Sequence, residues 1–207
     1  MKNIRPLIVT FEPGIELWQQ EAVREGIREV FELAKISDKI KIIEDSKIEL
    51  YLNKGVKEGR EGQINADVLA DLLNYELGKL SSSETYYKIL ILNRDIFLNG
   101  TNFVIGAVQG SVGVISIFRF LTLNPSDQQE CIKTEIIHEL GHIFGLIPES
   151  RKTMVENSLG LHCNKCCTMR QGLNVPKDWI KISKDRLQYG PFCDICLKDL
   201  QSFFSDE

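Results

Sequence analysis

Two histidines stand four residues apart in the segment His138-Glu139-Leu140-Gly141-His142. On an α-helix this spacing places both side chains on one face, so that both imidazole rings can bind one metal ion. Glu139 lies beside them, where its carboxylate can accept a proton from a metal-bound water instead of binding the metal. The segment therefore predicts a zinc site with Glu139 as general base, and it predicts that this site catalyses hydrolysis. The alternative is an ordinary helix that happens to carry two histidines.

A catalytic zinc usually has three protein ligands and a water, and this segment supplies only two of them. Gly145, three residues after His142, would let the helix end and the chain turn back, as in the longer pattern H-E-x-x-H-x-x-G-x-x-H of the metzincins. In this sequence Pro148 occupies the place of the third histidine, and proline cannot bind a metal. The third ligand must therefore come from another part of the chain.

His162, the remaining histidine, is the predicted third ligand. It follows a Gly-Leu pair, as the expected ligand position does, so we interpret residues 147–161 as an inserted segment that loops out and returns the chain to the site. We expect this segment to act as a mobile lid over a cleft, and the alternative is an exposed surface loop. Other ligand assignments stay open: Glu149 or Glu156 could be the third ligand, or His162 could belong to the cysteines that follow it.

Five of the six cysteines lie in the last quarter of the chain, namely Cys163, Cys166, Cys167, Cys193 and Cys196. The sequence shows neither a secretory signal nor an apolar run of about 20 residues that could span a bilayer, so we expect a cytoplasmic location. A reducing compartment disfavours disulfides, and clustered cysteines there indicate metal ligands. Cys131, which stands apart, is expected to be a buried thiol.

These residues together resemble one family, the archaemetzincins. The matching motifs are His162-Cys163, Cys167-Thr168-Met169 and Cys193-Asp194-Ile195-Cys196, and the stretches 60–73 and 95–120 are also similar to the family. The resemblance implies a metzincin fold and two zinc ions. It assigns a catalytic zinc to His138, His142 and His162, a structural zinc to Cys163, Cys167, Cys193 and Cys196, and a methionine turn beneath the first zinc to Met169.

The cysteine spacing departs from the family pattern, because only three residues separate Cys163 from Cys167. This leaves Cys166 as an alternative to Cys167, since Cys163-x-x-Cys166 has the common spacing of a zinc knuckle. The match of Cys167-Thr168-Met169 to the C-x-Met motif of the family favours Cys167. The gap between Met169 and Cys193 is also longer than is usual in the family.

The rest of the chain predicts a mixed α/β (α+β) fold with helices on a twisted sheet. Strands are expected at 6–11, 39–44 and 88–93, and two further strands, 102–109 and 112–120, are separated by two residues and should form a hairpin. Helices are expected at 23–34, from Asn65 onward, and from Pro125 and Ser126 through the histidines. We expect one compact unit over 1–207, with residues 1–145 as a lobe of sheet and helices and 146–207 as a small, irregular, zinc-stabilised lobe.

The formal net charge of −4 and the sequence pI near 5.5 argue against nucleic acid and membranes as partners. A zinc-ribbon nucleic-acid binder is the alternative suggested by the basic residues among 165–186, although acidic residues are interspersed there. The predicted partner is a peptide or protein substrate that pairs in extended form with an edge strand, either 102–109 or 112–120. The chain is thus predicted to be a zinc metallopeptidase, or alternatively a catalytically silent zinc module that binds peptides.

Overall fold

The computed structural model describes residues 3–45, 52, 60–79, 86–157 and 159–205. A five-stranded sheet with the strand order β2-β1-β4-β7-β6 forms its centre. The strands are β1 (Leu7–Phe11), β2 (Ile42–Asp45), β4 (Tyr87–Leu92), β6 (Gly106–Gln109) and β7 (Val112–Ser116). All neighbouring pairs are parallel except β6 and β7, which are antiparallel, and β6 forms one edge of the sheet.

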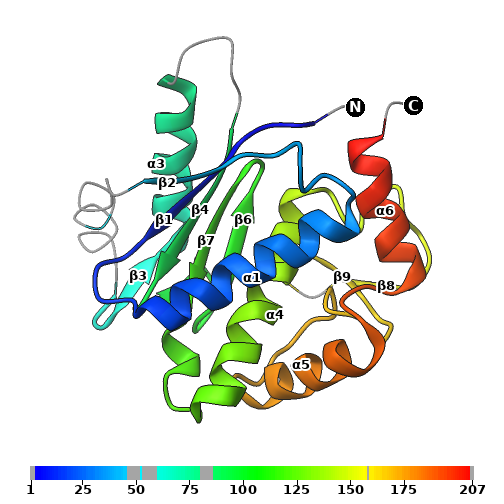
Figure 1. The fold of residues 1–207 in the computed structure, drawn as a ribbon. Coiled ribbons are helices and arrows are strands. Elements are labelled where there is room, and N and C mark those ends of the chain that lie inside the picture. The colour runs from blue at the N-terminus through cyan, green and yellow to red at the C-terminus, as the bar shows by residue number, and fades with distance from the viewer. Residues whose placement is uncertain (1–2, 46–51, 53–59, 80–85, 158, 206–207) are drawn as a thin grey trace.

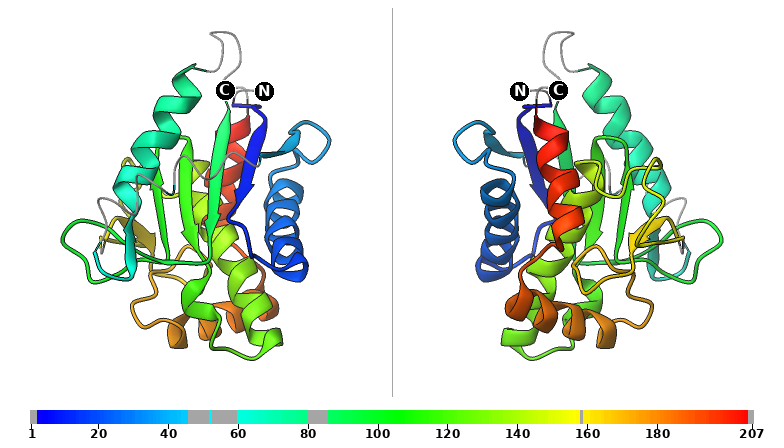
Figure 2. Two further views of the ribbon diagram at one scale, coloured as in Figure 1. Left: turned by 90° about the vertical axis from the view of Figure 1, so that its left-hand side faces the viewer. Right: turned by 90° about the vertical axis from the view of Figure 1, so that its right-hand side faces the viewer.

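Helices cover both faces of this sheet (Figures 1 and 2). The helices α1 (Leu17–Leu33) and α4 (Pro125–Ile143) pack on one face, and α3 (Ala66–Lys79) packs on the other. The strand β4 contributes apolar side chains to both faces of the sheet. Its side chains alternate, so that Ile89 and Ile91 join the core beneath α1 and α4 while Leu90 and Leu92 join the core beneath α3.

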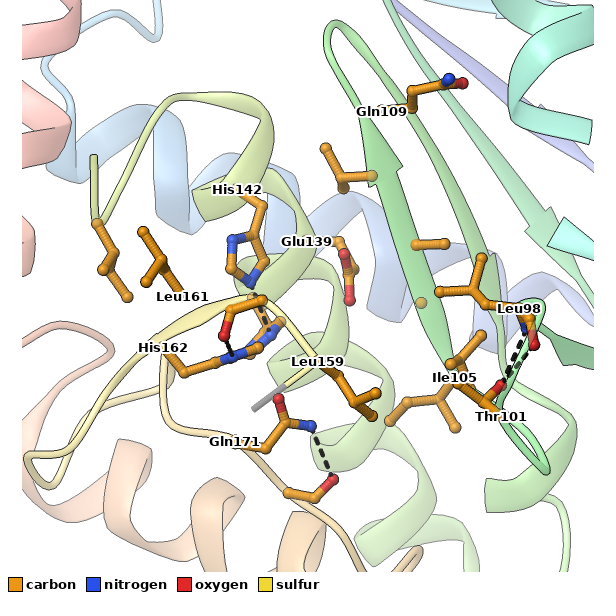
Figure 3. A pocket seen from close by; sticks show the side chains of 18 of the residues that line it. Leu98, Thr101, Ile105, Gln109, Glu139, His142, Leu159, Leu161, His162 and Gln171 are labelled. Atoms are coloured by element: carbon orange, nitrogen blue, oxygen red, sulfur yellow. Dashed lines mark hydrogen bonds between the residues drawn. The ribbon is translucent and has the colours of Figure 1, made fainter. Parts of the chain in front are cut away.

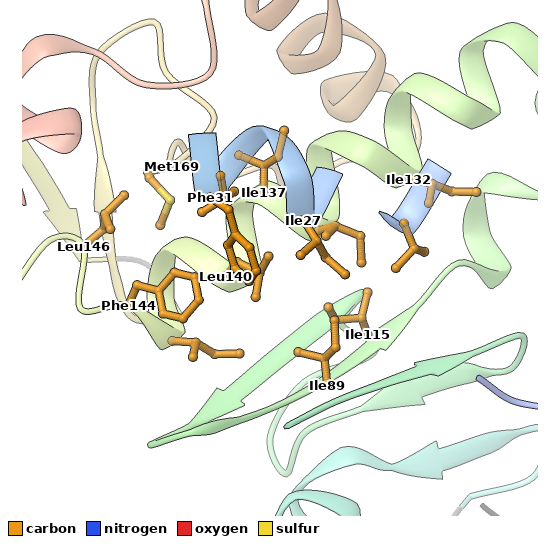
Figure 4. Packing of buried hydrophobic residues seen from close by; sticks show 14 of the residues in the cluster. Ile27, Phe31, Ile89, Ile115, Ile132, Ile137, Leu140, Phe144, Leu146 and Met169 are labelled. Atoms are coloured by element: carbon orange, nitrogen blue, oxygen red, sulfur yellow. The ribbon is translucent and has the colours of Figure 1, made fainter. Parts of the chain in front are cut away.

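The larger core also holds the C-terminal part of the chain. Figure 4 shows Ile27 and Phe31 of α1 meeting Leu140 and Phe144 at the end of α4. The same buried cluster continues through Leu146 and Met169 to Leu200 and Phe204 near the C-terminus. The helix α4 is therefore packed between the sheet and residues that follow it in the sequence.

The N-terminal lobe confirms most of the predicted elements. The predicted hairpin is formed by β6 and β7, which pair from Gly106 opposite Ile115 to Gln109 opposite Val112. Both strands are shorter than predicted, and residues Phe118–Phe120 form a 3-10 turn (η1) instead of continuing β7. The strand predicted at 39–44 begins later, at Ile42. The short strands β3 (Gln63–Asn65) and β5 (Asp95–Phe97) add a parallel pair.

The C-terminal lobe is more regular than predicted. Beyond the hairpin of β8 (Val155–Asn157) and β9 (Leu161–Cys163), it contains the helices α5 (Lys177–Tyr189) and α6 (Asp194–Phe204). The apolar face of α5 is interrupted by Ser183 and Arg186, which are both buried, and this conceals its helical period in the sequence. Among the described residues, no helix is long and apolar enough to cross a bilayer.

Candidate metal centres and cleft

The three histidines of the chain lie together at one point of the fold. His142 of α4 lies close to His162 of β9 (Figure 3), and His138 stands one helical turn before His142 in α4. Their ligand nitrogens all lie within 4.8 Å of one another, and Nε2 of His138 and Nε2 of His142 are 3.1 Å apart. Two nitrogens on a tetrahedral zinc would be about 3.3 Å apart, given Zn–N bonds of about 2.0–2.1 Å. The arrangement fits one zinc ion.

The outer nitrogens of two of these rings are held by backbone carbonyls. Nδ1 of His138 lies 2.8 Å from the carbonyl of Thr168, and Nδ1 of His162 lies 3.1 Å from the carbonyl of Gly160. Since a carbonyl can only accept, each Nδ1 carries the proton, and the Nε2 of each ring is the nitrogen that can bind a metal. Burial lowers the pKa of His138. The pKa of His142 is lowered to about 4, mainly by burial and also by the nearby charge of His162. Both rings are therefore neutral at pH 7.

The alternatives for the third ligand receive no support from the described residues. His162 joins the other two histidines and not the cysteines, and neither Glu149 nor Glu156 belongs to a group that could hold a metal. The turn at the end of α4 is also as predicted: Gly145 has φ +69°, and the N–H of Leu146 donates to the carbonyl of Gly141. The helix begins at Pro125 as predicted, and Asn124 caps it, because the side-chain oxygen of Asn124 accepts from the N–H of Asp127.

Met169 lies directly beneath the metal-binding turn of α4. It is fully buried, and a Cβ atom added to Gly141 would lie 2.3 Å from its sulfur. A side chain between the two histidines would therefore force the end of the Met169 side chain to move. This places Met169 where the family resemblance expects the methionine turn.

Glu139 lies between His142 and the edge strand β6 (Figure 3). It contacts the backbone of Gly106, where an added Cβ would lie 2.1 Å from Oε1 of Glu139 and 2.5 Å from Oε1 of Glu135. Glu135, one helical turn earlier, is fully buried beside it. Burial raises the pKa of Glu139 to about 7, and burial together with the charge of Glu139 raises the pKa of Glu135.

A cavity of about 800 Å³ opens beside the histidines. One wall is the strand β6 with the residues before it, and the opposite wall is formed by residues 159–162 and 171–175. In Figure 3, Ile105 and Leu159 face each other across this space, which has Glu139 and His142 at its inner side. The cavity is therefore bordered by an edge strand, a carboxylate and three histidine rings that could hold a metal ion.

Four cysteines form a second group behind the histidines, at the N-terminus of α6. The sulfurs of Cys163, Cys167, Cys193 and Cys196 all lie within 4.8 Å of one another, and those of Cys163 and Cys193 are 3.8 Å apart. Sulfurs on a tetrahedral zinc with Zn–S bonds of about 2.3 Å would be about 3.8 Å apart. Four thiols close the coordination sphere, so this group fits a structural zinc.

The structure brings Cys167 and not Cys166 into this group. Cys166 is exposed and lies near Arg170 and Asp185. The two groups are joined by β9, where the neighbours His162 and Cys163 point to opposite sides because side chains alternate along a strand. All six cysteines are free thiols, and Cys131 is buried as predicted.

Sequence comparison finds archaemetzincins. The chain is 32% identical over 82 residues to an archaemetzincin of Archaeoglobus fulgidus, a match that covers 39% of this chain and 42% of that protein. It is 35% identical over 88 residues to one of Methanopyrus kandleri, which covers 41% of this chain and 47% of the relative. These matches thus span less than half the length of the curated relatives. No protein-family model matches the chain.

The solved structures extend the likeness to the whole fold. The crystal structure of the Methanopyrus kandleri archaemetzincin superposes with a TM-score of 0.67 and 23% identity, covering 96% of this chain and 94% of that one. The chain thus resembles archaemetzincins in part of its sequence and shares their fold. A zinc-dependent peptidase of Methanocorpusculum labreanum shares the fold as well, with a TM-score of 0.64, 16% identity and coverage of 94% and 99%.

Sequence reasoning missed three residues around the histidine and cysteine groups: Glu135, Gly106 and Arg151. Glu135 stands four positions before Glu139, so a helical projection would have placed it on the same face. Gly106 gave a weaker signal, as an isolated glycine within a predicted strand, which often marks a close backbone approach. Nothing in the sequence distinguished Arg151 from the other basic residues, because its contacts with Cys163, Cys196 and Asp199 join residues distant in the chain.

Proposed function

We propose that this chain is a zinc-dependent peptidase of the metzincin type, with one catalytic and one structural zinc. The observation that carries the proposal is the convergence of three histidine nitrogens beside Glu139, at the inner side of a cavity that an edge strand borders. The histidines His138, His142 and His162 would hold the catalytic ion, and Cys163, Cys167, Cys193 and Cys196 would hold the structural one. The names of the relatives agree with this function.

Zinc bound to three histidines polarises a carbonyl and lowers the pKa of a bound water toward 7. The role of Glu139 follows from its place beside this position. Its carboxylate accepts a proton from the attacking water as the water oxygen bonds to the scissile carbonyl carbon. Glu139 then donates that proton to the leaving amine as the C–N bond breaks, so the residue ends the cycle as it began.

The substrate would be an extended peptide that adds to the sheet beside β6. The other side of β6 is paired with β7, so one row of its backbone N–H and C=O groups remains for a partner strand. The apolar side chains of Ile105, Leu159 and Val175 line the cavity and would contact alternate side chains of the peptide. Because all six cysteines are free, a reducing compartment such as the cytoplasm suits the protein.

The decisive test is the variant Glu139→Gln, assayed on a diverse peptide library with and without a chelator. We expect chelator-sensitive cleavage by the unaltered protein and a loss of at least about 100-fold in the variant, because a general base contributes about 10²–10⁴-fold. Glu149→Gln is the matched control, since Glu149 lines the same cavity but is exposed and outside the histidine group. Retained hydrolysis in Glu139→Gln would refute the mechanism.

Elemental analysis of protein purified without added metal tests the two ions. We expect two zinc ions per chain in the unaltered protein. His142→Ala should lose the zinc of the histidine site and keep one, and Cys196→Ser should lose the zinc of the cysteine site and keep one. Two bound zinc ions without chelator-sensitive cleavage of any peptide would instead favour a catalytically silent module that binds peptides.

A further inference from the structure

Arg151 lies in the inserted segment and is buried against the cysteine group. Only 5% of its side chain is exposed. Its guanidinium donates to the sulfur of Cys196 at 3.2 Å and to the sulfur of Cys163 at 3.5 Å. An arginine thus contacts two of the four thiols that fit a structural zinc, although it belongs to neither motif.

The remaining N–H groups of Arg151 bind the inserted segment and α6. Nη1 also donates to the carboxylate of Asp199 at 3.0 Å, Nε donates to the carbonyl of Thr153 and Nη2 to the carbonyl of Met154, both at 3.2 Å. A guanidinium has five N–H groups in a fixed planar fork, and here each has an acceptor. Such complete use of the fork fixes the side chain in one position.

The charge of Arg151 suits this place. Four thiolates around one divalent ion leave a net charge of about −2, and a buried charge requires a compensating partner. Hydrogen bonds from a cation to metal-bound sulfur stabilise the thiolate form and raise the affinity of a site for its metal. Lys165 and Cys193 also donate backbone N–H groups to sulfurs of the group, but Arg151 brings the positive side chain.

The same arginine fixes the first part of the inserted segment. Asp199 accepts from the N–H of Ile147 as well as from Arg151, so both ends of the stretch 147–151 are tied to α6. Met154, whose carbonyl Arg151 binds, has φ +56° and directly precedes β8, the partner strand of β9. The strand β9 in turn carries His162 to the histidine group.

We propose that Arg151 is a positioning residue that couples the two metal sites of this chain. It stabilises the thiolates of the structural site, and through the same guanidinium it holds the inserted segment in the path that delivers His162. The segment is in this respect anchored at its start by the cysteine site, while residues 147–149 and 159–161 of the segment border the cavity. The inference concerns metal binding and would stand even if the chain cleaved no peptide.

The test compares Arg151→Gln and Arg151→Lys with the unaltered protein. In cobalt-substituted protein, the thiolate-to-cobalt charge-transfer absorbance reports the cysteine site alone, so chelator competition gives its affinity directly. We expect Arg151→Gln to lower that affinity by about tenfold or more, the usual effect of removing a residue that binds metal ligands. Arg151→Lys keeps the positive charge but lacks the planar guanidinium. We expect this variant to fold and to lose less affinity for the metal than Arg151→Gln.

Hydrogen exchange over residues 147–157 of the same samples tests the coupling, and we expect faster exchange by about tenfold in Arg151→Gln. The matched control is Arg170→Gln, because Arg170 pairs with Asp185 at 2.8 Å in the same lobe without contacting the four cysteine sulfurs. Arg170→Gln should leave both measurements within twofold. The proposal is overturned if Arg151→Gln changes neither quantity, if only one of them changes, or if Arg170→Gln changes them equally.

Discussion

Replacing Gly106 with alanine should disable the site without removing either metal. The added Cβ would lie 2.1 Å from Oε1 and 2.3 Å from Cδ of Glu139, whereas ordinary contacts of a Cβ begin at 3.4 Å. The carboxylate of Glu139 must therefore move by about 1 Å, since neither the backbone of β6 nor that of α4 can separate without disturbing the core. Glu135 lies 2.5 Å from the same Cβ, so its carboxyl blocks one direction of escape.

A misplacement of about 1 Å at a reacting group lowers the rate by about 100-fold, which corresponds to about 2.7 kcal/mol in the barrier. We therefore expect kcat/KM of Gly106→Ala to fall about 100-fold on any peptide that the unaltered protein cleaves. The zinc content should stay unchanged, because Glu139 is not placed as a ligand. Thermal unfolding should show a moderate loss of stability, of about 1–3 kcal/mol for an overpacked contact.

Gly113→Ala provides the matched control in the neighbouring strand β7. The Cβ there would lie 3.2 Å from Cδ1 of Ile143, the flexible end of a side chain that can turn aside. We expect its kcat/KM to stay within about threefold of the unaltered protein. If Gly106→Ala also stayed within threefold, the argument that Gly106 positions Glu139 would be refuted.

Two further predictions concern stability and thiol reactivity. Arg186, whose side chain is 3% exposed, bridges Glu29 of α1 and Glu130 of α4. Arg186→Met would remove the arginine from both carboxylates, and their partial exposure to water limits the cost. We expect the stability to fall by about 2–3 kcal/mol. Calorimetry should then show Tm lower by about 5–10 °C, and a change below 2 °C would contradict this estimate of the ion pairs. Iodoacetamide at pH 8 should label Cys166 first in the metal-loaded protein, since Cys166 is exposed, whereas burial raises the pKa of Cys131 to about 11 and keeps it a neutral, inaccessible thiol. Peptide mapping that found Cys167 labelled and Cys166 protected would reverse the assignment of the fourth cysteine.

The sequence was sufficient to predict the residues whose spacing is local. His138, Glu139 and His142 follow from helical geometry, and Gly145 ends the helix where the longer motif requires it. The hairpin of β6 and β7 was predictable because two residues separate its strands. Local signals of this kind depend on the backbone of one element, so no knowledge of the rest of the fold is needed.

The sequence was insufficient where a position depends on distant residues. Both 102–109 and 112–120 were candidates for the edge strand, and only the pairing of β7 with β4 shows that β6 is the edge. The choice between Cys166 and Cys167 likewise depends on where β9 and α6 meet. The helix α5 escaped prediction because Arg186 and Ser183 lie on its buried face, where they bind Glu29, Glu130 and Thr134 of other helices.

The position of β6 also bears on how copies of this protein could associate. An open sheet edge is a template on which copies of a protein can associate through their backbones. Here the edge is only four residues long, and residues 159–162 and 171–175 stand opposite it across the cavity. A neighbouring copy would have to insert a single strand between these walls, and a folded sheet is too wide to do so. The same recess that would admit a lone peptide therefore discourages edge-to-edge aggregation.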